Sequence, residues 1–178
     1  MLRITVPEQE LYDERTEEFL YFKGGTLLLE HSLLSISKWE AIWKKPYINT
    51  KKTAEEALDY VRCMTINSNV NPLIYRCLTK ENVKEINEYV DDVKTATTFN
   101  DSGGPQREVV TSEIIYYWMI AQNVPIEFEK WHFSRLITLL KVCAIKNNPN
   151  KKKMSASEIA ARNRELNRAR RKKYNTKG

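Results

Sequence analysis

The side chains that could do nucleophilic chemistry are few, and the two histidines of the chain limit them. His31 is followed by Ser32, and His132 precedes Ser134 by two residues. Such a pair acts as base and nucleophile when a sharp turn exposes the serine and a third group orients the histidine. Neither serine lies in a glycine-containing strand-to-helix turn, so we expect both histidines to have structural roles.

The carboxylates and cysteines do not form a catalytic or metal-binding pattern either. Acidic residues occur as sequence neighbours, such as Glu55 with Glu56 and Asp91 with Asp92, and neighbours on a helix point apart. Three cysteines at positions 63, 77 and 143 lack CxxC spacing, so they are expected to be small core residues in a reducing compartment. With two histidines, the chain has too few ligands for a zinc site. The sequence therefore predicts no catalytic, metal or cofactor site, and a protein that is not an enzyme.

The basic residues gather at the C-terminal end. Residues 151–178 hold eleven of the 29 Lys and Arg and two acids, a net charge of +9, whereas the whole chain is +6 and residues 1–150 are therefore −3. This difference predicts a body over residues 1–150 and a basic tail over 151–178. The tail residues expected to contact an acidic protein helix or nucleic acid phosphate are Arg162, Arg164, Arg168, Arg170, Arg171, Lys172 and Lys173.

The body is predicted to be a single globular, mainly α domain. The chain has 178 residues, of which 42% are hydrophobic, enough for one core. Alternation over Leu2–Val6 and an aromatic run over Phe19–Phe22 predict a small hairpin or sheet within about residues 1–30. Helix signals dominate after that point, and a helix is also expected in the basic tail, opened by Ser155 and Glu158 and running to about Lys173.

Capping residues and apolar spacing place the helices of the body. Ser32 to Lys44, a capping box at Thr53 with Glu56, and a cap at Thr79 each predict a helix. On the first of these, Trp39 and Trp43 are one turn apart and share a face. This pair could anchor a protein partner, and the alternative is ordinary core packing.

The second half of the body contains the most apolar segment. Thr111–Gln122 is nearly apolar all round, which predicts the central buried helix. After Pro125, a longer helix over about Glu127–Lys146 is expected to pack back onto it. The polar stretch Thr95–Gln106 predicts a loop. No window has the eighteen apolar residues of a membrane span and no export signal begins the chain, so we expect a soluble intracellular protein without membrane contact.

Three strings carry a resemblance to a known family: LEHSLLSISKWE (Leu29–Glu40), TSEIIYYWMIAQNVPIEFEKWH (Thr111–His132) and RNRELNRARRKKYNTKG (Arg162–Gly178). In these strings, and over nearly its whole length, the chain resembles proteins encoded in the structural gene clusters of bacteriophages, in particular the tail assembly chaperones of long-tailed phages. The resemblance implies a mostly helical protein without a catalytic site.

The resemblance also implies partners and a place of action. A tail assembly chaperone binds the long helical tape measure protein, helps recruit tail tube protein, and acts in the host cytoplasm during phage assembly. Two alternatives remain open. A structural virion subunit, such as a connector or tail completion protein, would form a homo-oligomer from the same body and stay in the virion. A nucleic-acid-binding accessory protein would place its basic tail on phosphates without reading sequence.

Overall fold

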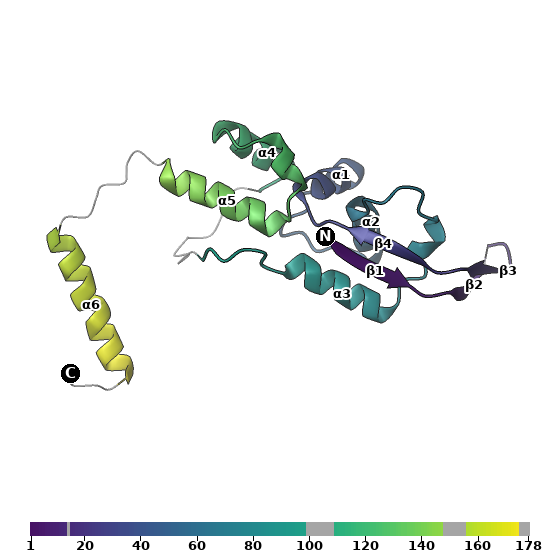
Figure 1. The fold of residues 1–178 in the computed structure, drawn as a ribbon, viewed down its shortest axis with the longest axis horizontal. Coiled ribbons are helices and arrows are strands. Elements are labelled where there is room, and N and C mark those ends of the chain that lie inside the picture. Colours follow the sequence, from purple (N-terminus) through teal and green to yellow (C-terminus); the bar gives the residue numbers. More distant parts are fainter. Residues whose placement is uncertain (14, 99–108, 148–155, 175–178) are drawn as a thin grey trace. The chain divides into compact units, whose positions relative to one another are not determined.

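The computed structural model describes residues 1–13, 15–98, 109–147 and 156–174. The chain divides into two compact units, Met1–Ala144 and Ile145–Gly178, and each is described by itself. The predicted boundary at Lys151 lies outside the described residues. The fold is mainly helical with four short strands at the N-terminus (Figure 1), which confirms the predicted fold class at that level. Among the described residues, no helix has the length and hydrophobicity needed to cross a membrane.

The N-terminal strands form a two-stranded antiparallel ribbon. Strand β1 (Leu2–Val6) pairs with β4 (Gly25–Leu29), and β2 (Gln9–Asp13) pairs with β3 (Glu18–Phe22). The register is the same in both pairs, because Leu2 faces Leu29 and Gln9 faces Phe22, so partner numbers add to 31 throughout. The two pairs therefore follow one another along a single ribbon, as the predicted N-terminal hairpin requires.

The buried side of the ribbon changes between the two strand pairs, on either side of Pro7 and Gly24. In β1 the even residues Ile4 and Val6 are buried, whereas in β2 the odd residue Leu11 faces inward and its neighbours are exposed. Gly24 has a positive φ of 78°, and a Cβ there would lie 3.1 Å from the carbonyl oxygen of Val6. Glycine is required at this position, since other residues are strained at that φ. In β2 and β3, Glu10, Tyr12, Phe19 and Tyr21 are therefore exposed.

Five helices of the first unit follow the strands, and their caps match the sequence. Helices α1 (Leu33–Trp43), α2 (Ala54–Met64) and α3 (Lys80–Asp91) begin after Ser32, Thr53 and Thr79, whose side chains each accept a hydrogen bond from the N3 backbone N–H. Helices α4 (Ser112–Ala121) and α5 (Phe133–Lys146) come later, and two short 3-10 helices are η1 (Pro72–Tyr75) and η2 (Ile126–Lys130). In the second unit, α6 spans Ala156–Tyr174.

The core of the first unit consists of two clusters of buried side chains. The larger cluster lies between the ribbon and helices α1 and α2, and it contains Ile4, Leu27, Leu29, Ile36, Trp39 and Met64. Cys77 belongs to this cluster, as expected for a small core residue, whereas Cys63 and Cys143 are half-buried. The smaller cluster joins α4 and α5 to the start of α1 through Leu33, Ile115, Met119, Leu136 and Leu140.

The prediction that Thr111–Gln122 forms the central buried helix is wrong. The helix exists as α4, but it buries Ser112, Ile115 and Met119 along one stripe, while Tyr117 and Ile120 are 66% and 72% exposed. Only one stripe of α4 packs on the rest of the unit, because α1 and the ribbon already fill the larger core with Trp39 at its centre. An apolar helix at the surface exposes hydrophobic area, which commonly marks an interaction site.

The single helix predicted over Glu127–Lys146 is also divided. It separates into η2 and α5, with an extended break at Trp131 and His132. The break has a tertiary cause: His132 forms a β-bridge with Ser32, and the backbone N–H of Phe133 donates to the carbonyl oxygen of His31 at 2.8 Å. Pairing with residues 31 and 32 therefore replaces helical hydrogen bonds at this point.

Candidate protein-binding groove between α4 and α5

The two histidines lie together in the interior. His31 is 4% exposed, its Nδ1 is 2.5 Å from the hydroxyl of Tyr60, and its ring centroid is 5.2 Å from that of His132. Burial, with smaller effects of His132 and Lys52, lowers the pKa of His31 from 6.5 to about 3. His31 is therefore neutral at physiological pH. Ser32, its sequence neighbour, is engaged as the N-cap of α1.

The second histidine contacts the serine that the sequence singled out. Nδ1 of His132 lies 2.9 Å from the hydroxyl of Ser134, and Nε2 lies 3.1 Å from the backbone carbonyl oxygen of Tyr89. The Ser134 hydroxyl also accepts the backbone N–H of Lys94 at 3.1 Å. The ring nitrogen of His132 that faces away from Ser134 thus contacts a backbone carbonyl, whereas the histidine of a catalytic triad contacts a carboxylate at this position. These hydrogen bonds tie the end of α3 to the start of α5, which is a structural role.

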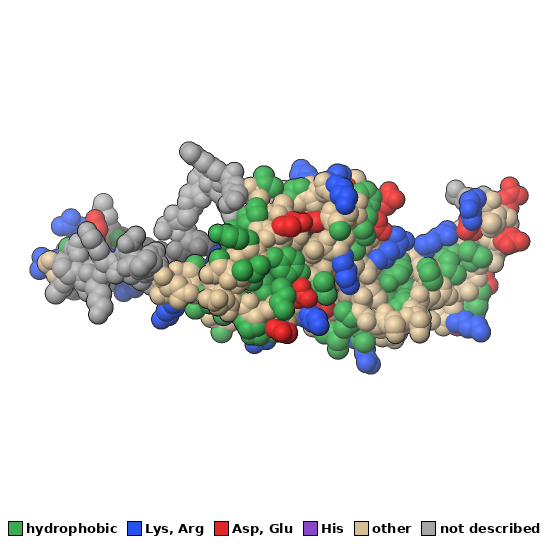
Figure 2. Space-filling model, turned by 90° about the horizontal axis from the view of Figure 1, so that it is seen from above, with side chains coloured by type: hydrophobic (Ala, Val, Ile, Leu, Met, Phe, Trp, Pro, Cys, Tyr) green, Lys and Arg blue, Asp and Glu red, His purple; other side chains and the backbone are tan. Residues whose placement is uncertain are grey.

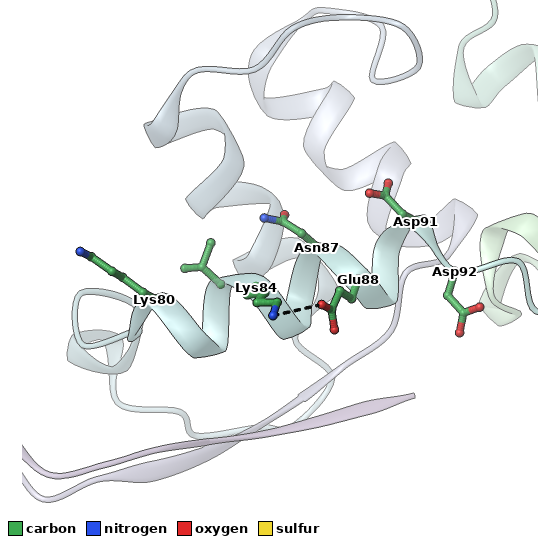
Figure 3. Close-up of a pocket in the computed structure, with 7 residues that line it drawn as sticks. Lys80, Lys84, Asn87, Glu88, Asp91 and Asp92 are labelled. Atoms are coloured by element: carbon green, nitrogen blue, oxygen red, sulfur yellow. Dashed lines mark ion pairs between the residues drawn. The ribbon is translucent and has the colours of Figure 1, made fainter.

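Other polar clusters in the described part of the chain do not converge. No group of three or more His, Cys, Asp or Glu side chains there could hold a metal ion. A shallow depression runs along α3, where Lys80, Lys84, Asn87, Glu88, Asp91 and Asp92 follow one another along the helix and point in different directions (Figure 3). Its Lys84 and Glu88 form an exposed ion pair at 3.8 Å, and such pairs contribute little free energy. This depression is a solvated helix face.

The two tryptophans proposed as partner anchors differ in their environments. Trp39 is fully buried, and its indole N–H donates to the carbonyl oxygen of Glu56 at 2.8 Å. Its side chain has no surface for a partner, so the core-packing alternative holds for Trp39. Trp43 is half-buried and stacks on Trp39 with ring centroids 6.4 Å apart. Within the described residues, the buried indole nitrogen of Trp43 has no hydrogen-bond partner.

The predicted basic residues all lie on α6. The side chains of Arg162, Arg164, Arg168, Arg170 and Arg171 are exposed, whereas those of Lys172 and Lys173 lie outside the described side chains. At 3.6 residues per turn, Arg164, Arg168 and Arg171 share one face of this helix. In the second unit, these three cations therefore form one stripe.

A mainly apolar groove lies between α4 and α5 in the first unit. Its volume is about 570 Å³, and its wall includes Trp118 of α4 and Gln122, the C-cap residue of that helix. Helix α5 contributes Phe133, Ile137 and Leu140 from successive turns, which share one face of a helix at this spacing. The remaining lining residues are Ile48, Val110, Lys141 and Ala144. We call this site the α4–α5 groove.

One residue that lines the α4–α5 groove, Gln122, has an unsatisfied polar atom. The side-chain oxygen of Gln122 is buried and accepts no hydrogen bond from the described residues. A buried acceptor without a donor costs free energy, so natural proteins generally satisfy such groups. The groove thus combines a mainly apolar wall with the side chains of Gln122 and Lys141, a mixture that ligand and peptide sites also have.

Sequence reasoning missed this groove because it placed all of α4 inside the core. Glu113, Tyr117 and Gln122 are among the polar side chains of the segment Thr111–Gln122 and were the available signal, since polar groups in a mainly apolar segment indicate faces that meet water or a partner. The contribution of α5 was harder to foresee. It depends on the break at His132, which is produced by pairing with residues about one hundred positions earlier.

Comparisons with known proteins give no match from which a role for the groove could be inferred. The chain matches no protein-family model, no curated protein and no solved structure.

Proposed function

We propose that this protein is a non-enzymatic assembly protein that binds an amphipathic helix of a protein partner in the α4–α5 groove. The observation that carries the proposal is the groove itself, a mainly apolar groove of about 570 Å³ lined by residues of two helices. A helix of the partner can pack into the groove between α4 and α5. Its apolar stripe would then contact Trp118 and Ile137 and displace water from them.

The partner that fits this site best is a long helical protein. Together with the resemblance to tail assembly chaperones, this leads us to assign the role of a chaperone that holds the phage tape measure protein and recruits tail tube protein to it. A helix with an exposed apolar stripe aggregates when it is unprotected. Covering that stripe until the tail assembles is a function that needs a groove and no catalytic group. Such a protein acts in the host cytoplasm and leaves before the virion is complete.

The experiment measures binding of tape measure fragments from the same phage to the full chain. Ile137→Glu places a charge in the α4–α5 groove and should weaken binding at least about tenfold, the effect of a typical hot spot. Ile42→Glu is the matched control, because Ile42 is 60% exposed on α1 and does not line the groove. Equal affinity of the two variants and the wild type would contradict the proposal.

A second candidate function rests on the arginine stripe of α6. Arg164, Arg168 and Arg171 share one face, and such a stripe suits nucleic acid phosphates as well as an acidic protein helix. In the nucleic-acid case, affinity for duplex DNA falls steeply with salt, is indifferent to sequence, and is lost in the triple Arg→Gln variant. Detection of the protein in purified virions would favour a structural virion subunit over a chaperone.

A further inference from the structure

The outer face of the β2–β3 hairpin carries three exposed aromatic side chains. Tyr12, Phe19 and Tyr21 are 51%, 73% and 55% exposed. Tyr12 is paired with Phe19 in the strand register, with ring centroids 5.2 Å apart. Tyr21 is paired with Glu10, two positions further along the hairpin. All four side chains lie on one side of the ribbon, because alternate residues of a strand point the same way. We call Glu10, Tyr12, Phe19 and Tyr21 the hairpin face.

The hairpin face is held in place from its inner side. The side-chain amide of Gln9 donates to the carbonyl oxygen of Cys77 at 2.7 Å, and Arg76 pairs with Asp13 at 3.2 Å. Phe22 is buried and Leu11 packs against the core. These contacts fix the hairpin against the segment around η1. The outward aromatic rings are therefore presented by a fixed support, which lowers the entropy cost of binding.

Charge around the hairpin face is strongly acidic. Residues 8–23 contain six acids against Arg15 and Lys23. Glu8 accepts a hydrogen bond from the hydroxyl of Tyr21 at 2.7 Å. Glu10, Glu17 and Glu18 are exposed and, within the residues that the structure describes, form no ion pair. In the space-filling view, hydrophobic side chains lie at the surface of the hairpin with acidic side chains near its tip (Figure 2).

We propose that the hairpin face docks a basic, arginine-containing segment of a partner protein. Guanidinium groups stack on the exposed faces of Tyr and Phe rings and pair with carboxylates, so one arginine uses both features of this surface. The acidic surround repels nucleic acid and anionic membranes, which leaves a cationic peptide as the matching occupant. This site is separate from the α4–α5 groove and does not depend on the function proposed for it.

The test uses the full chain and a synthetic amphipathic arginine-rich peptide of about 15 residues, long enough to form a helix. Binding should produce NMR shifts confined to residues 8–22. The double variant Tyr12→Ser/Phe19→Ser should weaken binding at least about tenfold, and Glu10→Gln should weaken it by a smaller factor. Glu85→Gln, an exposed glutamate on α3, is the matched control and should have no effect. A peptide with lysine at each arginine position should bind more weakly at equal charge, since lysine stacks less well.

Three outcomes would overturn the proposal. Shifts spread over all acidic surfaces would indicate binding by charge alone. Unchanged affinity of the serine double variant, with its fold verified by circular dichroism, would remove the aromatic rings from the site. Self-association of the wild type that disappears in the double variant would identify a second copy of the chain as the occupant.

Discussion

The carboxylate of Glu40 on α1 caps the first turn of α4 through Ser112. One carboxylate oxygen accepts the backbone N–H of Ser112 at 2.8 Å and its hydroxyl at 2.5 Å, and the other accepts the backbone N–H of Tyr47 at 2.7 Å. Thr111, at the N-cap position of α4, makes no side-chain capping bond. A negative charge at a helix N-terminus is also favoured by the helix dipole. Glu40 therefore positions α4, and with it one wall of the α4–α5 groove.

Replacing Glu40 with alanine should destabilise the protein by about 2 to 4 kcal/mol, because three donors lose their acceptor in a buried site. The free energy of unfolding in urea measures this change. Glu85→Ala is the control, since Glu85 is exposed on α3, and surface substitutions of this kind stay within about 0.5 kcal/mol. A loss for Glu40→Ala no larger than that of the control would show that α4 is held by its apolar stripe alone.

The stability losses of two tryptophan substitutions should distinguish a core residue, Trp39, from a groove residue, Trp118. Trp39→Ala removes a fully buried ring and its hydrogen bond to Glu56, at a cost of about 3 to 5 kcal/mol. Trp118 is half-buried in the groove wall, so Trp118→Ala should cost about 1 to 2 kcal/mol and weaken helix binding. Denaturant unfolding and a binding titration on both variants check the pair. Equal stability losses would place Trp118 in the core.

The sequence was sufficient for elements defined by local patterns. The N-cap residues Ser32, Thr53 and Thr79 each precede a helix because their side chains bond to a backbone N–H three residues away. The hairpin followed from alternation between polar and apolar residues, although that alternation did not reveal the positive φ of Gly24.

Features set by distant residues could not be foreseen. The Glu40 carboxylate reaches Ser112, 72 positions away, and nothing in either local segment signals that pairing. The apolar composition of α4 predicted burial on all sides, yet only the stripe with Ser112, Ile115 and Met119 is buried. Of the two tryptophans one turn apart on α1, spacing alone could not show that Trp39 is inside and Trp43 half-exposed. Local patterns thus locate the helices, and long-range packing decides which faces remain available for a partner.

The buried histidine predicts how stability depends on pH. His31 has a pKa of about 3 in the folded protein because of its burial, against 6.5 when unfolded. The unfolded state therefore binds the proton first, so the contribution of His31 to stability is complete above pH 6.5 and is lost as the pH falls toward 3. The slope from this one group reaches about 1.4 kcal/mol per pH unit. His132, whose pKa burial also lowers, adds in the same direction.

Urea unfolding between pH 7 and pH 4 measures this slope for the wild type and for His31→Gln, which cannot be protonated in that range. Carboxylates contribute equally to both proteins, so the difference in slope isolates the histidine. A shallower slope in the variant is the expected result. Parallel slopes would mean that His31 is protonated in the folded state.

Removing the second unit should leave the first one folded. The buried cores consist of residues between Ile4 and Leu140, and the first compact unit ends at Ala144. A chain ending at Asn150 keeps the whole of α5 and both clusters. Its thermal unfolding should remain cooperative, with a Tm within about 4 °C of the full chain, the shift expected for less than 1 kcal/mol. Calorimetry on both chains measures this, and a retained affinity for the helical partner would assign that binding to the first unit. Loss of the cooperative transition would instead show that residues beyond 150 complete the core, and the division into two units would fail as a description of stability.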